Sequence, residues 1–486
     1  MPGNGRRGMS PFWIALLIGV CLPAVLPQLA HGSSGETAGS SAAAPITATP
    51  GYTITIPSDP GQPVEIVLTI ASPPPRLELY FDPAGRSGGQ QRLEAISAHR
   101  GDGTVLPVER LANGGFRVDT QGAAAVTVTY RLNLSPSLWS PATWPGRELA
   151  SVRVEDVVWL VGRDTLLHVA GADQRPKEVR LHLPAGWRAY QGGVGLVDVQ
   201  RPLSVASGEE PLLLLGRFEI SRYPVPGGQL TLVVSANPPW EPGQLAWSVE
   251  VVLERLMSKG IRVSPADLTL VVLRYPGALR LNPLIGSQLA GGHTIVHWVG
   301  TGTLTWWRKH AARDVVAWAL ERTLRLAPDA RWLQAGMAEY GALTLLFDTG
   351  LLTVDDMYQS LRALHSNGLH YSGPAWPSVV AAALESPPSH AGERVLAFRA
   401  PLVTMLLDLQ LHAASGGTAD VFDLWARLVA AQQEGPPVTL FTAAVLAPLA
   451  ELGLPADFTQ NYIYGTRLPP ADFDRLFEQW FEQHAR

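Results

Sequence analysis

The sequence predicts a multidomain α+β protein. An N-terminal antiparallel β-sandwich-like domain is expected first, then an α/β segment and an α-helical C-terminal domain. The chain has 486 residues, which corresponds to about three domains of ordinary size. Its apolar pattern is strand-like as far as residue 236 and becomes mostly helical after that. Hydrophobic residues make up 46% of the chain and charged residues 16%, so it can bury large cores.

Residues 1–30 have the pattern of an export signal. Arg6 and Arg7 precede an apolar run over residues 12–30, and a basic start followed by an apolar stretch is typical of a secretory signal peptide. A membrane anchor is the alternative, because the run is just long enough to span a bilayer. Residues 31–50 are rich in Gly, Ser, Ala, Thr and Pro and are predicted to form a flexible linker. We therefore expect an exported protein: periplasmic, extracellular or membrane-anchored.

Composition excludes several classes of chemistry. Cys21 is the single cysteine and lies inside the predicted signal, so a processed chain would have no disulfide, no thiolate nucleophile and no cysteine-ligated metal. The formal net charge of −5 gives no general attraction to nucleic acid, since phosphate binding needs clustered cations. No nucleic-acid partner is expected, and membrane contact is expected only through residues 12–30.

The N-terminal β domain is predicted over residues 51–236. Runs such as YTITI, VEIVLTI and AVTVTYRLNL are short and rich in β-branched residues. Gly, Pro, Asp or Ser bounds each of them, as in an antiparallel domain with two layers of strands. No long helix is expected in this part.

After residue 236 the pattern alternates and then becomes helical. Residues 245–260 have apolar positions at helical spacing and a glycine stop, while 268–273 and 293–299 are strand-like. We place an α/β segment over 237–400 and an α-helical domain over 401–486. The helices predicted from residue 304 onward are 304–326, 331–348, 353–366, 394–414, 418–432, 438–452 and 470–484.

One segment contains a motif with a specific spacing. Trp318 is followed by Trp332, Gly336 and Tyr340, the last three within the run RWLQAGMAEY. This arrangement resembles the active-site core of gluzincin metallopeptidases, and most closely that of the glycyl aminopeptidase family. In that family HExxH-x-W lies on one helix, and W-x-x-E-G followed by a Tyr lies on the next. The resemblance covers about residues 50–486 and implies a thermolysin-like, peptidase-like domain over 237–400.

The family motif has a defined chemistry. Two His at i and i+4 hold zinc, the Glu beside the first His is the general base, and the distal Glu is the third ligand. The matching positions here are Ala312, Arg313, Val316 and Ala335. Ala and Val have no donor atom, and Arg is a fixed cation that cannot act as a base. The resemblance therefore implies a vestigial site with no catalytic residue, no metal, no cofactor and a lost zinc site.

The resemblance continues downstream over residues 395–424. Asp408 matches an Asp of the family pattern there, and Arg399 stands in the place of a Lys. Ala397 stands at a position that the family fills with a tyrosine, and such a tyrosine is expected to stabilise the oxyanion. The hydroxyl that would take this role is therefore missing as well.

These losses predict an exported, non-catalytic aminopeptidase-like protein, a pseudopeptidase of the cell envelope that binds a peptide or protein. Gly291, Gly292 and His293 lie where the family has a substrate-binding strand, although no Glu follows. A peptide could pair with the edge of such a strand.

Two other hypotheses stay open from the sequence. The first is an active metallo-aminopeptidase-like hydrolase that uses a shifted metal site of His310, Asp314 and Glu339; it breaks the tryptophan register of the motif. The second is a purely structural envelope protein, in which side chains such as Trp307 and Arg313 fill the cleft that corresponds to the family's active site.

Overall fold

The computed structural model describes residues 48–81, 92–135, 151–172, 175–192, 194–206, 211–235, 240–263, 268–274, 294–299, 303–385, 389–433, 439–451, 454–467 and 469–484. All of them belong to one compact unit, Pro45–Arg486, and a separate short unit spans Met1–Ala44. The predicted signal, most of the predicted linker, and the predicted peptide-binding residues Gly291, Gly292 and His293 lie outside the described residues.

The N-terminal part is rich in strands, as predicted. Its seven-stranded sheet has the order β15 (Leu203–Val205), β12 (Lys177–His182), β1 (Gly51–Thr55), β2 (Val64–Ala71), β8 (Ala125–Leu132), β4 (Leu93–Arg100), β5 (Val105–Leu106). A four-stranded sheet has the order β11 (His168–Val169), β3 (Arg76–Tyr80), β7 (Phe116–Asp119), β6 (Val108–Arg110). A five-stranded sheet has the order β14 (Gly195–Val197), β13 (Arg188–Gln191), β16 (Leu212–Gly216), β10 (Val157–Val161), β9 (Val152–Val154).

Alternation along these strands produces the core of the β region. In β2 every second side chain is buried, because successive residues of a strand point to opposite faces. Ile66 and Leu68 of β2 pack in one cluster with Leu77 and Leu79 of β3, so two sheets share a core as in a β-sandwich. The only helix described in this region is the four-residue α3 (Gly162–Thr165). The predicted β-sandwich-like domain is confirmed.

One pairing differs from the expected antiparallel arrangement. β1 and β12 run parallel, with Tyr52 opposite Val179. Parallel neighbours need a long crossover between them, and more than a hundred residues separate these two strands in the sequence. No local sequence pattern indicates such a pairing.

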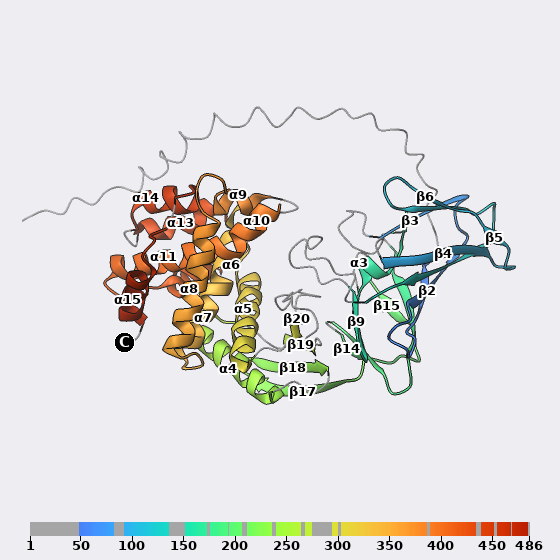
Figure 1. Cartoon of the computed structure of the whole chain (residues 1–486), viewed down its shortest axis with the longest axis horizontal. Helices are drawn as coiled ribbons and strands as arrows, with labels where there is room; N and C mark the ends of the chain where they lie inside the picture. The colour runs from blue at the N-terminus through green and yellow to red at the C-terminus, as the bar shows by residue number, and fades with distance from the viewer. Residues whose placement is uncertain are drawn as a thin grey trace, which may run out of the picture. The chain divides into compact units, whose positions relative to one another are not determined.

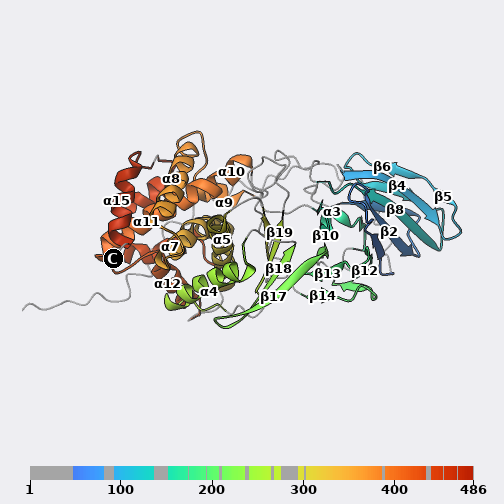
Figure 2. The same cartoon turned by 60° about the horizontal axis from the view of Figure 1, so that its bottom comes forward.

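A four-stranded sheet follows, in the order β17 (Phe218–Val225), β18 (Gly228–Ser235), β19 (Leu268–Arg274), β20 (Thr294–Val299). β17 and β18 form an antiparallel hairpin, and β18, β19 and β20 are mutually parallel neighbours. The helix α4 (Pro242–Ser258) lies between β18 and β19 in the sequence and buries Leu245, Val249, Val252 and Leu256. Figure 2 shows β17, β18 and β19 side by side. The sheet therefore takes strands from both sides of the predicted boundary at residue 236.

Helices dominate from residue 304, as predicted (Figure 1). The α-helices are α5 (Leu304–Thr323), α6 (Arg331–Gly336), α7 (Ala342–Asp348), α8 (Val354–His370), α9 (Val379–Leu384), α10 (His390–Arg394), α11 (Ala400–Ser415), α12 (Val421–Gln433), α13 (Thr442–Glu451), α14 (Ala456–Phe458) and α15 (Phe473–His484). A 3₁₀ turn, η4, spans Pro328–Ala330. Three π-helical turns lie next to α-helices: η5 (Met337–Gly341), η6 (Val395–Arg399) and η7 (Thr459–Ile463).

One hydrophobic core joins these helices to the four-stranded sheet. It includes Leu230 of β18, Trp307 and Trp318 of α5, Trp332 of α6 and Trp480 of α15. The predicted segments 237–400 and 401–486 therefore share this core. Ala391–Ser415 is the one described helical stretch that is long and apolar enough to cross a membrane, and 72% of its apolar window is buried inside the protein. That burial is what a core helix shows.

Candidate functional site

The tryptophans of the motif are core residues. Trp318 and Trp332 are fully buried, and the Trp332 indole N–H donates a hydrogen bond to Thr442 Oγ1 at 3.3 Å. Gly336 lies where α6 meets α11: a Cβ there would clash with Thr404 Oγ1 and lie 2.8 Å from the Ala400 carbonyl oxygen. The residues of the motif thus fix how these helices pack.

The positions that match the zinc ligands are filled by hydrocarbon. Ala312 and Val316 of α5 and Ala335 of α6 are 2%, 0% and 8% exposed and belong to the large core. None of these side chains has a nitrogen, oxygen or sulfur atom that could bind a metal.

Arg313 lies between two carboxylates. Its Nε donates a hydrogen bond to Asp314 Oδ1 at 2.8 Å, and its Nη1 is 3.9 Å from Glu339 Oε2 of η5. The Asp314 side chain is only 2% exposed. Burial lowers the pKa of Arg313, but Asp314 and Glu339 outweigh it and hold that pKa above its ordinary value. Arg313 is a fixed cation here, paired with both acids.

Burial shifts the pKa of Glu339 in the opposite direction to that of Arg313. Desolvation raises the pKa of Glu339, and the nearby charge of Asp314 adds to that increase, while Arg313 and Lys309 lower it. Lys309 Nζ also donates a hydrogen bond to Ser360 Oγ at 2.7 Å. We call Lys309, Arg313, Asp314 and Glu339 the Arg313 cluster.

The shifted metal site does not assemble in this structure. His310 packs edge-to-face against Trp306, with ring centroids 4.1 Å apart, while Asp314 and Glu339 both face Arg313. Within the described ranges, His310, Asp314 and Glu339 are not a group whose ligand atoms lie within 4.8 Å of one another.

Two further positions named from the resemblance, Ala397 and Arg399, lie in η6. Ala397 of η6 is exposed, and the adjacent Phe398 stacks on Tyr371 with ring centroids 5.3 Å apart. Arg399 is fully buried and donates hydrogen bonds to the carbonyl oxygens of Pro377 at 3.1 Å and Gly465 at 2.8 Å. Burial lowers its pKa to about 10. This guanidinium joins distant segments of the chain.

A second polar cluster joins Tyr340 and Asp408, both named from the resemblance, to His412 and His484, which sequence reasoning missed. Asp408 and His412 of α11 and His484 of α15 bring their ligand atoms within 4.8 Å of one another. His484 Nε2 is 2.9 Å from Asp408 Oδ2, and His412 Nδ1 is 3.8 Å from Asp408 Oδ1. The Tyr340 hydroxyl donates to Asp408 Oδ2 at 2.5 Å and accepts from Trp480 Nε1 at 2.8 Å. We call Tyr340, Asp408, His412 and His484 the Asp408 cluster.

The electrostatics of the Asp408 cluster follow from its burial. Burial lowers the pKa of His484, but the bond to Asp408 outweighs this and the net pKa is raised. The pKa of Tyr340 is held well above its ordinary value, first by burial and then by the Asp408 charge. The sequence contained one signal of this cluster, the i, i+4 spacing of Asp408 and His412. His484 is 72 residues beyond His412, and no local pattern connects the two.

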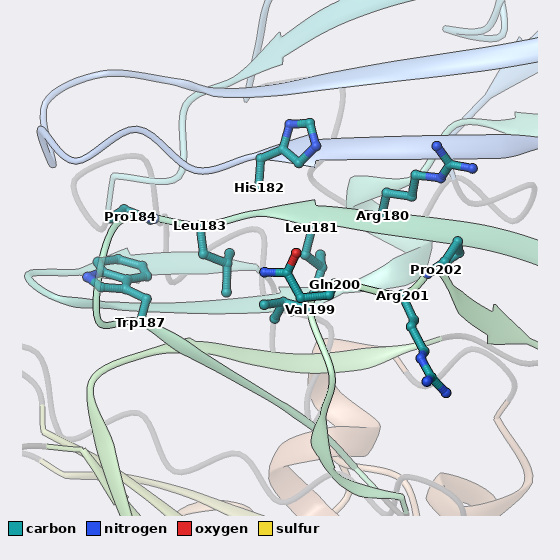
Figure 3. Close-up of a pocket in the computed structure, with 10 residues that line it drawn as sticks. All are labelled: Arg180, Leu181, His182, Leu183, Pro184, Trp187, Val199, Gln200, Arg201 and Pro202. Atoms are coloured by element: carbon teal, nitrogen blue, oxygen red, sulfur yellow. The ribbon is translucent and has the colours of Figure 1, made fainter.

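A pocket of about 740 Å³ lies in the β region. It is lined by Arg180, Leu181, His182, Leu183, Pro184, Trp187, Val199, Gln200, Arg201 and Pro202. Figure 3 shows Arg180 and Arg201 toward one end and Trp187 toward the other. Arg201 Nε is also 3.5 Å from Asp198 Oδ2. The pocket combines an apolar wall with two guanidinium groups.

Known proteins share parts of this architecture. Residues 52–200 match the Peptidase M61 N-terminal domain. The chain is similar in structure to an aminopeptidase N family protein from Idiomarina loihiensis, with a TM-score of 0.62, 15% identity, and 88% of this chain and 78% of that chain covered. It is also similar to the M1 zinc metallopeptidase from Deinococcus radiodurans, with a TM-score of 0.46, 14% identity, and 87% and 94% covered. No curated protein matches the sequence.

The match to the M61 N-terminal domain and the similarity to the Idiomarina loihiensis protein define the fold of the chain. The chain has the multidomain fold of an aminopeptidase N family protein and an M61-type N-terminal domain. The predicted resemblance to gluzincin aminopeptidases is confirmed at the level of the fold and of the N-terminal domain.

Proposed function

We propose that this chain is an exported, non-catalytic aminopeptidase-like protein that binds a peptide or protein ligand. The observation that carries the proposal is the Arg313 cluster. The position of the general base holds a guanidinium paired with Asp314 and Glu339. Arg313 cannot accept the proton of an attacking water.

The residues of the motif do not fit zinc, the metal that the resemblance implies. A catalytic zinc needs three protein donors of nitrogen, oxygen or sulfur. Ala312, Val316 and Ala335 supply only carbon and are buried in the core. A divalent cation beside Arg313 would also be repelled by its charge. We derive no hydrolytic step at this position.

The pocket of the β region supports a binding role. Guanidinium groups such as Arg180 and Arg201 pair well with carboxylates, and Trp187 and Leu183 offer an apolar wall. Ligand sites are commonly apolar with a few convergent polar groups. A peptide with a free carboxylate and an apolar side chain has this combination. Export is proposed from the basic and apolar pattern of residues 6–30.

The test is a peptidase assay on the purified protein, with and without a chelator. Aminoacyl and peptide substrates should be hydrolysed no faster than in a blank. Chelator-sensitive hydrolysis together with stoichiometric zinc would refute the proposal. His310→Ala and Glu339→Gln then locate the site: loss of that hydrolysis in folded variants would support the shifted metal site. The binding role is tested by titrating a peptide with an apolar C-terminal residue. The double variant Arg180→Ala and Arg201→Ala should weaken binding, and a C-terminally amidated peptide should bind less tightly.

A further inference from the structure

We propose that Asp408, His412 and His484 form a binding site for a divalent transition metal such as zinc. The site does not include the positions that match the zinc ligands of the motif, and it does not depend on the proposed function. Asp408 and His412 lie one helical turn apart on α11, and His484 reaches them from the last turn of α15. Their ligand atoms lie within 4.8 Å of one another.

The spacing is close to what a metal requires. Zinc binds nitrogen and oxygen at roughly 2.0–2.2 Å, so tetrahedral ligands are roughly 3.4 Å apart. The separation of His484 Nε2 from Asp408 Oδ2, 2.9 Å, and that of His412 Nδ1 from Asp408 Oδ1, 3.8 Å, lie on either side of this value. The separations between the donors are therefore of the size that a shared ion requires.

The other atoms of these side chains have the supporting contacts of metal ligands. A ligating histidine usually donates its second ring N–H to a carbonyl or carboxylate. His484 Nδ1 has such a contact, 2.8 Å from the Trp480 carbonyl oxygen, and this leaves its Nε2 facing Asp408. Asp408 is held in turn by the Tyr340 hydroxyl and by the backbone N–H of Val421 at 2.9 Å. His412 Nδ1 is the nitrogen that faces Asp408 Oδ1, so metal binding through it would replace its 3.3 Å contact with the Asp408 carbonyl oxygen.

The donor set selects the kind of metal. Two imidazoles with one carboxylate suit zinc, cobalt or nickel, whereas calcium and magnesium prefer oxygen ligands alone. The side chains of Asp408, His484 and His412 are 1%, 6% and 11% exposed, so the site is mostly shielded and most open at His412. Metal binding requires the ligating nitrogens of His484 and His412 to be free of protons.

The experiment uses the full mature chain, stripped with a chelator and then titrated with zinc by calorimetry at about pH 8, where imidazoles are free of protons. Cobalt is added to a second sample, because the visible spectrum of tetrahedral cobalt reports nitrogen and oxygen ligands directly. We expect one ion per chain and a cobalt spectrum. His412→Gln and His484→Gln should each weaken zinc binding by at least about 10-fold. His370→Gln, on an exposed histidine of α8, and His310→Gln are matched controls and should bind as the unmodified chain does.

Three results would overturn the site. They are no zinc heat and no cobalt spectrum for the folded unmodified chain, undiminished binding in both His412→Gln and His484→Gln, or loss of binding in His310→Gln alone. In the first case His484 and Asp408 form only a proton-bridged pair. Peptidase activity is read separately: zinc binding without hydrolysis supports both proposals. Hydrolysis that disappears in His484→Gln would keep the metal site and refute the non-catalytic function.

Discussion

The Arg313 cluster and the Asp408 cluster meet at two consecutive residues, Glu339 and Tyr340, but differ in chemistry. Glu339 faces Arg313, while its neighbour Tyr340 donates to Asp408. In the first cluster, Arg313 stands at the position that matches the general base of the motif and is paired with the carboxylates of Asp314 and Glu339. The second adds two imidazoles, of His412 and His484, to the carboxylate of Asp408, and no motif predicts these histidines. A sequence motif can therefore locate a site in the fold, but the ligand atoms present there decide what the site can bind.

The turn between the two clusters explains how one segment serves both. η5 is a π-helical turn at Met337–Gly341, and such turns insert an extra residue into a helix and are frequent at functional sites. Consecutive side chains within it, Glu339 and Tyr340, contact different groups of helices. The two clusters can be perturbed one at a time, and the following variants do so in order of expected effect.

Asp408→Ala should have the largest effect, about 3–5 kcal/mol of lost unfolding free energy. The side chain is 1% exposed, and its removal leaves His484 and the Tyr340 hydroxyl without their acceptor. Urea denaturation measures the change, with the chelator present so that no metal contributes. Asp408→Asn keeps one acceptor oxygen and should lose less. A loss below about 1 kcal/mol for Asp408→Ala would mean that the cluster does not support the core.

Arg313→Ala should destabilise the protein by about 2–4 kcal/mol, because it leaves the buried Asp314 carboxylate without its cation. Arg313→Lys keeps the charge and should recover part of this loss. The same denaturation experiment serves for both. If Arg313→Ala is as stable as the unmodified chain, the guanidinium does not neutralise the two acids.

Gly336→Ala tests the contact between α6 and α11 that supports both clusters. Overpacking should cost about 1–3 kcal/mol, since the new methyl group would clash with Thr404 and lie 2.8 Å from the Ala400 carbonyl oxygen. Adding Thr404→Ala removes only the side-chain clash, so it should restore part of the thermal midpoint. Full restoration would show that the backbone contact relaxes.

Glu339→Gln gives the smallest effect, and its signature is a pH dependence. The folded pKa of Glu339 is raised above its ordinary value of 4.5, so its contribution to stability is present below that pH and is lost as pH rises through the folded pKa. The stability of the unmodified chain minus that of Glu339→Gln should therefore fall above pH 4.5, by at most about 1.4 kcal/mol per pH unit.

Asp356→Asn is the control of opposite sign. Burial raises the pKa of Asp356, but its hydrogen bonds with Thr353 outweigh this and lower it. Its contribution should be lost as pH falls through the folded pKa. If the two stability differences changed with pH in the same direction, burial would not be the cause of the raised pKa of Glu339.

The fold could be predicted wherever periodicity is local. The helix over residues 304–326 and the strand over 268–273 correspond to α5 and β19 within a few residues. The parallel pairing of β1 with β12 could not be predicted, because it joins segments far apart in sequence. The π-helical turns inside the predicted helices 331–348 and 394–414 were also missed, since helical periodicity in a sequence does not distinguish one i→i+5 turn from the i→i+4 turns around it.

Part of the site could be located from the spacing of the motif. That spacing pointed to Ala312, Val316 and Ala335, and their side chains are buried in the core. The pairing of Arg313 with Glu339 was not predictable, because it joins α5 to η5 and no local sequence pattern connects the two residues. The Asp408 cluster needs three-dimensional contact between α11 and α15.

The hairpin of β17 and β18 matters for anyone dividing this chain into fragments. Residues Leu230–Val234 pair with Leu268–Val272, so a fragment that stops at residue 236 would carry an open apolar ribbon prone to self-association. The complementary fragment would begin without two strands of its sheet and without Leu230 and Leu232, which its interior needs. A cut just ahead of Phe218 keeps that sheet whole, and soluble expression of the two halves should depend on this choice.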